Sequence, residues 1–110
     1  RRNYIHIDDV VDGILYSINN FNRLKSEIYN LGLSSANLTK IMLAKKIKKQ
    51  LPKLKINIIK NIKDPDQRDY YVSNKKIEKR GFKAKVNIDD GIKELIDIFT
   101  YSKEKITNNY

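Results

Sequence analysis

The sequence has no cysteine and only one histidine, His6, among its 110 residues. Without cysteine there are no disulfides and no thiolate metal sites, and one histidine makes no zinc site unless several carboxylates converge on it. In strand-like surroundings His6 is more typical of a packed or surface residue than of a catalyst. The chain also lacks a signal peptide and an apolar run long enough to span a bilayer. We therefore expect a soluble, cytoplasmic module that binds no metal.

Glycine is scarce and scattered, with Gly13, Gly32, Gly81 and Gly91 too far apart to cradle a pyrophosphate. The sequence therefore predicts no cofactor site of its own. No internal repeat and no linker rich in glycine or proline is visible. We expect one domain over residues 1–101 and a polar, frayed tail over residues 102–110. The chain opens on Arg1-Arg2 without an initiator methionine, which suggests a fragment.

Acidic residues are few, and the formal net charge is +10. No acidic residue occurs between Ile28 and Lys63, where nine lysines accumulate. Such a run favours a stand-alone basic module that binds nucleic acid or another anionic partner. Against this, the cations are mostly lysine rather than the arginine that reads bases, and the accompanying isoleucine and asparagine indicate the codon bias of an AT-rich genome. A solvated basic face is the other interpretation.

Apolar periodicity predicts both helices and strands. Strands are expected over residues 4–7, 27–33, 55–61 and 69–72. Helices are expected over residues 10–19 and 38–51, over one or two turns before Gly81, and after a cap at Asn87. The order β-α-β-α-β-β-α-α predicts an α/β fold.

The stretch from Lys63 to Phe82 combines a turn, a strand and a short helix. Pro65 bars helix at the turn, and the following Tyr70-Tyr71-Val72 run favours extended structure. Lys63 and Arg68 stand on either side of the turn. We interpret this loop as an anion clamp.

Two motifs imitate catalytic sites. Asp64-Pro65-Asp66 has the spacing of a metal-binding Asp-x-Asp, but a turn uses the same residues. Tyr71 and Lys75, and likewise Tyr101 and Lys105, have the Tyr-x-x-x-Lys spacing of a dehydrogenase base. The first pair straddles a strand end and a helix cap, and the second lies in the polar tail. We therefore assign no catalytic residue and no metal ligand.

Four short motifs occur in a fixed order. Residues 2–10 read R-N-Y-I-H-I-D-D-V, residues 28–32 read I-Y-N-L-G, Arg68-Asp69-Tyr70 precedes Ser73 and Lys76, and residues 87–92 read N-I-D-D-G-I. In this order they resemble the C-terminal part of the NAD-dependent epimerase/dehydratase family, the extended short-chain dehydrogenases that act on nucleotide sugars. Ser73 departs from the aspartate that the family has at this position.

The resemblance implies an α/β fold, namely the C-terminal substrate-binding portion of an extended short-chain dehydrogenase, with mixed short strands, about four helices and no N-terminal Rossmann half. It implies that the missing half binds NAD and supplies the catalytic base, and that the substrate is a nucleotide sugar. It is also compatible with a homodimer as the full enzyme. It also implies a phosphate-binding site. Arg2 matches a family arginine that binds the substrate's phosphates, Lys63 stands near the position of a second, and Arg68 shares its role.

Overall fold

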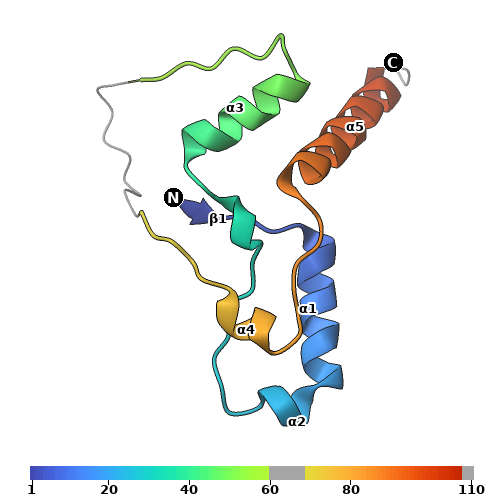
Figure 1. The fold of residues 1–110 in the computed structure, drawn as a ribbon. Coiled ribbons are helices and arrows are strands. Elements are labelled where there is room, and N and C mark those ends of the chain that lie inside the picture. The colour runs from blue at the N-terminus through green and yellow to red at the C-terminus, as the bar shows by residue number, and fades with distance from the viewer. Residues whose placement is uncertain (60–68, 108–110) are drawn as a thin grey trace.

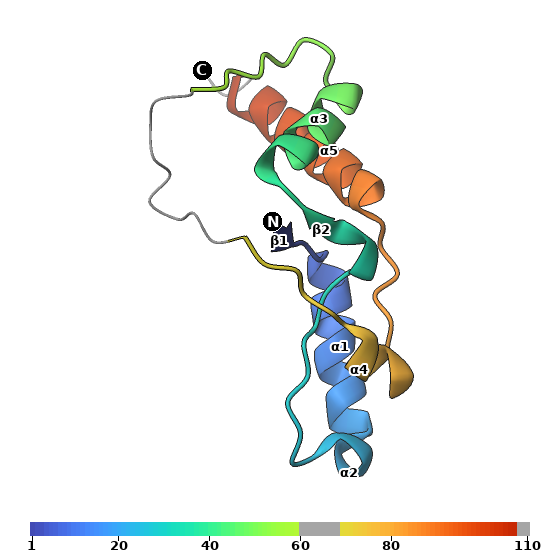
Figure 2. The ribbon, with the colours of Figure 1, turned by 60° about the vertical axis from the view of Figure 1, so that its left-hand side comes forward.

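The computed structural model describes residues 1–59 and 69–107, with side chains as far as Tyr101. Its elements are β1 (Arg2–Asn3), α1 (Ile7–Asn19), α2 (Phe21–Leu24), the 3-10 turn η1 (Ser34–Ala36), β2 (Asn37–Leu38), α3 (Lys40–Gln50), α4 (Lys75–Lys79) and α5 (Ile88–Thr107). β1 and β2 form an antiparallel pair in which Arg2 faces Leu38 and Asn3 faces Asn37. Helices α1, α2 and α4 gather at one end of the molecule, and α3 and α5 lie together at the other (Figure 1, Figure 2).

Helix α1 begins where His6 supplies a cap, because the His6 Nδ1 accepts a hydrogen bond from the Asp8 amide at 3.3 Å. Asp8 and Asp9 then place negative charge in the first turn. Asp9 is only 2% exposed, and its carboxylate accepts from the amides of Lys85 and Val86 at 2.8 and 3.0 Å. This buried carboxylate therefore fastens α1 to the segment that leads into α5.

The core is small and lies where the N-terminal residues cross the segment around η1. Leu33, Ala36 and Ala84 are buried together, with Tyr4 and Ile5 packed against them. Ile77 of α4 and Phe82 are also buried, and the Phe82 ring lies 5.6 Å from that of Tyr16 on α1. These contacts hold α4 against α1.

Two side chains of α3 form hydrogen bonds with Asp89 of α5. Lys46 donates to the Asp89 carboxylate at 2.8 Å, and the Gln50 side chain donates to the Asp89 carbonyl at 2.8 Å. Helix α5 is capped by Asn87, whose Oδ1 accepts from the amides of Asp89 and Asp90. Among the described helices, none combines the length and the apolar character that crossing a lipid bilayer requires.

The predicted α/β fold is wrong. Within the described residues the chain is mostly helical, with one sheet of two strands, and it does not resemble the C-terminal domain of a short-chain dehydrogenase. The described parts of the predicted strands at 27–33, 55–61 and 69–72 are not strands, and at 4–7 the helix has already begun at Ile7. The physical reason is that a β-prone segment becomes a strand only beside a partner ladder, and the backbone at Ile28, Leu33 and Val72 is bound by side chains instead.

The helix predictions fared better because their signals are local. The helices expected over 10–19 and 38–51 correspond to α1 and α3, which confirms them. Gly81 follows α4 with φ +105°, a left-handed conformation that favours glycine, and Asn87 caps α5 as expected. The α5 backbone continues to Thr107, and fraying of the tail over 102–110 stays a prediction.

Candidate functional site

The candidate site is the corner where β1 meets the segment that begins at Asp69. The Arg2 guanidinium carbon lies 5.0 Å from the centroid of the Tyr70 ring, and the Arg2 Nη1 donates to the Arg1 carbonyl at 2.8 Å. A guanidinium held over a ring is attracted through its face, whereas its hydrogen-bond donors point outward from its edge. Arg2 is thereby oriented by Tyr70, a residue far away in the sequence.

An asparagine holds the Tyr70 segment in place. The Asn37 Oδ1 accepts from the Val72 amide at 2.9 Å, and the Asn37 Nδ2 donates to the Val72 carbonyl at 3.0 Å. Asn37 belongs to β2 and faces Asn3 of β1. In an extended chain, side chains two residues apart lie on the same side. Holding Val72 therefore also positions Tyr70, which contacts Arg2. The Asn37 side chain thus makes the backbone hydrogen bonds that a neighbouring strand would otherwise make.

A cluster of partly or fully buried polar side chains lies next to this corner. The Asn3 Nδ2 donates to the Leu33 carbonyl at 2.8 Å, and Asn74, which is 1% exposed, approaches Asn3 Oδ1 at 3.4 Å. Gly32 leaves the room for this contact, since a Cβ there would lie 1.6 Å from the Asn3 Oδ1. The Ser34 hydroxyl donates to Glu78 at 2.6 Å and so extends the cluster to α4. Buried amides of this kind fix the register of three crossing segments.

Asp69 supplies a negative charge at the same corner. Its exposed carboxylate contacts the N-terminal amino group of Arg1. The hydrogen bond from that amino group lowers the pKa of the Asp69 carboxyl, and the charges of the amino group, Arg1 and Arg2 lower it further. The corner is therefore a mixed site in which a carboxylate lies among cations.

Lys76, one of the motif residues, anchors the segment before Leu31. Its ammonium donates to Glu27 at 2.6 Å and to the Ile28 carbonyl at 2.9 Å, and it lies 4.9 Å from the centroid of the Tyr29 ring. The hydrogen bond and the charge of Lys76 lower the pKa of Glu27. Lys76 therefore positions the chain rather than facing a ligand.

The structure places only one of the three predicted phosphate-binding residues. Arg2 is at the corner, whereas Lys63 and Arg68 lie outside the described residues. His6 is confirmed as a packed residue, with its Nε2 at 3.0 Å from Glu94. Among the side chains that the structure describes, no three histidine, aspartate or glutamate residues are grouped to hold a metal ion.

Two residues that shape the corner were missed in the sequence. Asn37 lies between the strand expected over 27–33 and the helix expected over 38–51, and nothing in its position there indicates that its side chain binds Val72. Asp69 belongs to the predicted strand over 69–72 and to the motif Arg68-Asp69-Tyr70, but no role at the site was predicted for its carboxylate. Neither contact is local, so spacing alone did not predict it.

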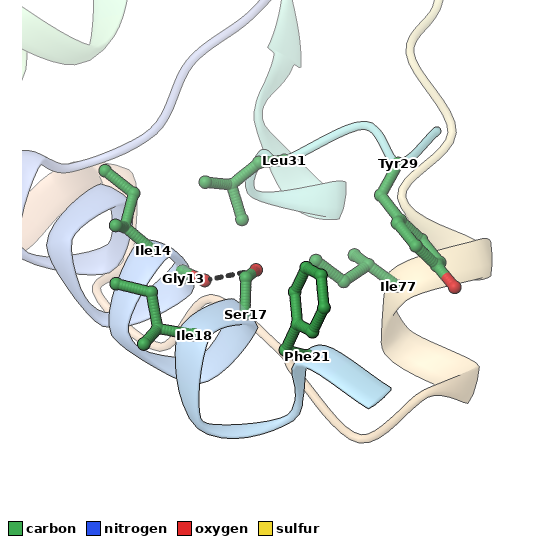
Figure 3. Close-up of a pocket in the computed structure, with 8 residues that line it drawn as sticks. All are labelled: Gly13, Ile14, Ser17, Ile18, Phe21, Tyr29, Leu31 and Ile77. Atoms are coloured by element: carbon green, nitrogen blue, oxygen red, sulfur yellow. Dashed lines mark hydrogen bonds between the residues drawn. The ribbon is translucent and has the colours of Figure 1, made fainter. Parts of the chain in front are cut away.

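A separate hollow opens beside α1 (Figure 3). It has a volume of about 320 Å³ and is walled by Ile14 and Ile18 of α1, Phe21 of α2, Leu31, and Ile77 of α4. The Ser17 hydroxyl donates to the Gly13 carbonyl at 2.7 Å within the helix, as the dashed line in Figure 3 marks. The hollow is almost wholly apolar and so suits apolar side chains better than a charged ligand.

When the chain is compared with models of known protein families, none of them matches it.

Proposed function

We propose that this chain is the part of an NAD-dependent nucleotide-sugar epimerase/dehydratase that binds the substrate's diphosphate. The proposal rests first on the four motifs that occur in the family's order, at residues 2–10, 28–32, 68–76 and 87–92. In the complete enzyme, NAD oxidises a sugar hydroxyl, the sugar is epimerised or loses a group, and the hydride returns. This chain would bind the substrate's phosphates during these steps.

One observation carries this proposal, the position of Arg2 over Tyr70. The predicted site requires the cation before Tyr4 and the turn before Tyr70 to approach the same diphosphate. Arg2 and Tyr70 are in contact, and Asn37 fixes the segment through Val72. A guanidinium oriented in this way suits the oxygens of a phosphate group, which accept paired hydrogen bonds from arginine.

The exposed apolar side chains of α1 support the proposal that another part of the enzyme packs against this helix. Its Val11, Ile14, Leu15 and Ile18, which we call the α1 apolar face, are each exposed by about half or more, as is Phe21 at the hollow of Figure 3. A helix that carries apolar side chains at this spacing normally buries them. We propose that the half of the enzyme that binds NAD and supplies the base covers this face.

The test is made in an enzyme that contains this segment. Arg2→Ala should weaken nucleotide-sugar binding about ten- to a hundredfold, because each hydrogen bond to a charged group contributes roughly 1.5–3 kcal/mol. Arg68→Ala should weaken it as well, and Lys63→Ala less, because water and salt screen a mobile ammonium. The matched control is Arg23→Ala, an arginine of α2 that donates to the Arg80 carbonyl.

The dissociation constants for substrate and for NAD separate the outcomes. We expect NAD binding to be unchanged in all four variants. If Arg2→Ala left substrate affinity intact, or weakened NAD binding as much as substrate binding, Arg2 would not bind the phosphates. The 110-residue chain alone should neither bind NAD nor turn over a nucleotide sugar, since it has no phosphate loop and no base. Calorimetry showing micromolar NAD binding by this chain would contradict the family assignment.

A second candidate function is a basic module for nucleic acid. It is favoured by the exposed Lys45, Lys48 and Lys49 of α3, which the structure places on the outer side of that helix. Binding by such lysines alone should be weak, indifferent to sequence and lost at moderate salt. A tight, sequence-selective DNA complex that persists at physiological salt would favour this candidate over the first.

A further inference from the structure

A large hollow lies between α3 and α5, at the opposite end from α1. It has a volume of about 940 Å³, near the top of the range of roughly 300–1,000 Å³ that binding pockets span. Its apolar lining is Ile47, Leu51, Ile92, Leu95, Ile96 and Phe99. We call this hollow the α3–α5 groove.

The α5 wall of the groove is incompletely covered. Leu95 is 54% exposed and Phe99 is 72% exposed, although they belong to the apolar stripe of α5. Leu51 continues the apolar surface into a neighbouring hollow that it forms with Pro52, Lys53 and Leu54. Such a contiguous apolar surface marks a site of interaction.

The charge on the α3 side of the groove has one sign. Lys53 belongs to the lining, none of the described lining residues is acidic, and α3 itself contains no acidic residue. Exposed Lys48 follows directly after the lining residue Ile47, which puts it about 100° around α3 from the groove. The α5 side carries both signs, because exposed Lys93 follows Ile92 and exposed Asp97 follows Ile96. The groove therefore has ammonium groups along its α3 side, and it suits an occupant that turns carboxylates toward α3 beside an apolar stripe.

The backbone of the walls determines the form of the occupant. Most of the lining belongs to α3 and α5, whose backbone groups bond within the helix and offer no free edge to an extended peptide. An irregular peptide would leave its own backbone groups without partners in an apolar groove, whereas a helix satisfies them internally. We propose that the α3–α5 groove binds an acidic amphipathic helix of a partner protein, which completes a three-helix arrangement with α3 and α5.

This occupant is preferred over a second copy of the chain, since two molecules of charge +10 repel each other and the lysines around their grooves would meet. It is also separate from the proposed phosphate site, because neither Arg2 nor Tyr70 lines the groove. The inference therefore stands or falls independently of the proposed function.

The test uses two synthetic helical peptides as probes for the full 110-residue chain. Both carry leucine at positions i, i+3, i+4 and i+7, and they differ only in their flanking residues, glutamate in one and lysine in the other. Fluorescence anisotropy should show the acidic peptide binding at least about tenfold more tightly than the basic one. Equal binding of the two peptides, or binding of neither, would overturn the proposal.

Variants locate the binding. Phe99→Ser should weaken the acidic peptide about tenfold, because a large apolar anchor is lost from the groove. Lys53→Glu should weaken the acidic peptide about three- to tenfold and strengthen the basic one. Ile14→Glu on the α1 apolar face is the control and should change neither affinity. All three side chains are exposed, so the variants should keep the fold, which circular dichroism and amide spectra verify.

Two alternatives give distinct results in the same experiments. If anionic phospholipid vesicles bound the chain and displaced the acidic peptide, the groove would be a membrane site and the proposal would be wrong. If sedimentation showed dimers that Phe99→Ser abolished, the occupant would be a second copy. A peptide effect of Ile14→Glu equal to that of Phe99→Ser would move the site to α1.

Discussion

The two ends of this molecule are held together by different means. At the α1 end, buried polar groups tie distant segments to one another: Asp9 binds the amides of Lys85 and Val86, and the Asn3 and Asn74 amides meet beneath β1. At the α3–α5 end, α3 buries none of its described residues fully, and exposed contacts to Asp89 join the helices. The comparison teaches that polar contacts between distant segments position the backbone around Arg2, whereas the α3–α5 end keeps an exposed apolar surface.

The largest effect should come from removing the buried Asp9 carboxylate. Asp9→Ala leaves the partly buried amides of Lys85 and Val86 without their charged acceptor, so the free energy of unfolding should fall by about 3 kcal/mol. Asp12→Ala, at an exposed position of the same helix, should change it by less than about 0.5 kcal/mol. Urea denaturation of both variants measures the difference. Equal effects would show that the carboxylate of Asp9 is not what fastens α1.

A smaller but still marked effect should follow from filling the space at Gly32. Gly32→Ala forces its Cβ against the Asn3 Oδ1 and should cost about 1–3 kcal/mol in the free energy of unfolding. Asn3→Ala removes the obstacle, so the double variant should be less destabilised than the sum of the two single changes. Additive costs in this cycle would mean that the close approach of Gly32 and Asn3 is not the source of the strain.

At the other end, breaking the Lys46 contact with Asp89 should have little effect. The pair is partly exposed, and such ion pairs contribute roughly 0.2–1 kcal/mol. Lys46→Met should therefore lower the free energy of unfolding by less than about 1 kcal/mol, and the loss should shrink as salt is added. A loss comparable with that of Asp9→Ala would remove the contrast between the two ends.

The smallest effect concerns pH. Lys76 lowers the pKa of Glu27 below its usual 4.5, first through the hydrogen bond and then through its charge. A lowered carboxyl pKa stabilises the folded state above the unfolded pKa, and this contribution is lost as the pH falls through the folded value. In an NMR titration the Glu27 midpoint should rise toward 4.5 in Lys76→Met. Lys79→Met, at another exposed position of α4, is the control and should leave the Glu27 midpoint unchanged.

Part of the fold could be predicted because helix signals are local. The apolar spacing of α1 and α3, the Asn87 cap and the left-handed Gly81 all involve residues within a few positions of one another. The strands could not be predicted, since the Tyr70 segment has strand-like residues but binds the Asn37 side chain instead of a neighbouring strand. At the candidate site, Arg2 was predicted, whereas the roles of Asn37 and Asp69 were not.

The sequence by itself determined that helices form in the regions of α1, α3, α4 and α5 and that the charge is strongly positive, because each of these depends on composition or on near neighbours. Only the tertiary structure decided that Arg2 lies over Tyr70 and that α3 and α5 leave a groove. Contacts between distant segments form only where the burial of the whole chain offsets the conformational entropy lost on folding. A short stretch of sequence does not determine that difference.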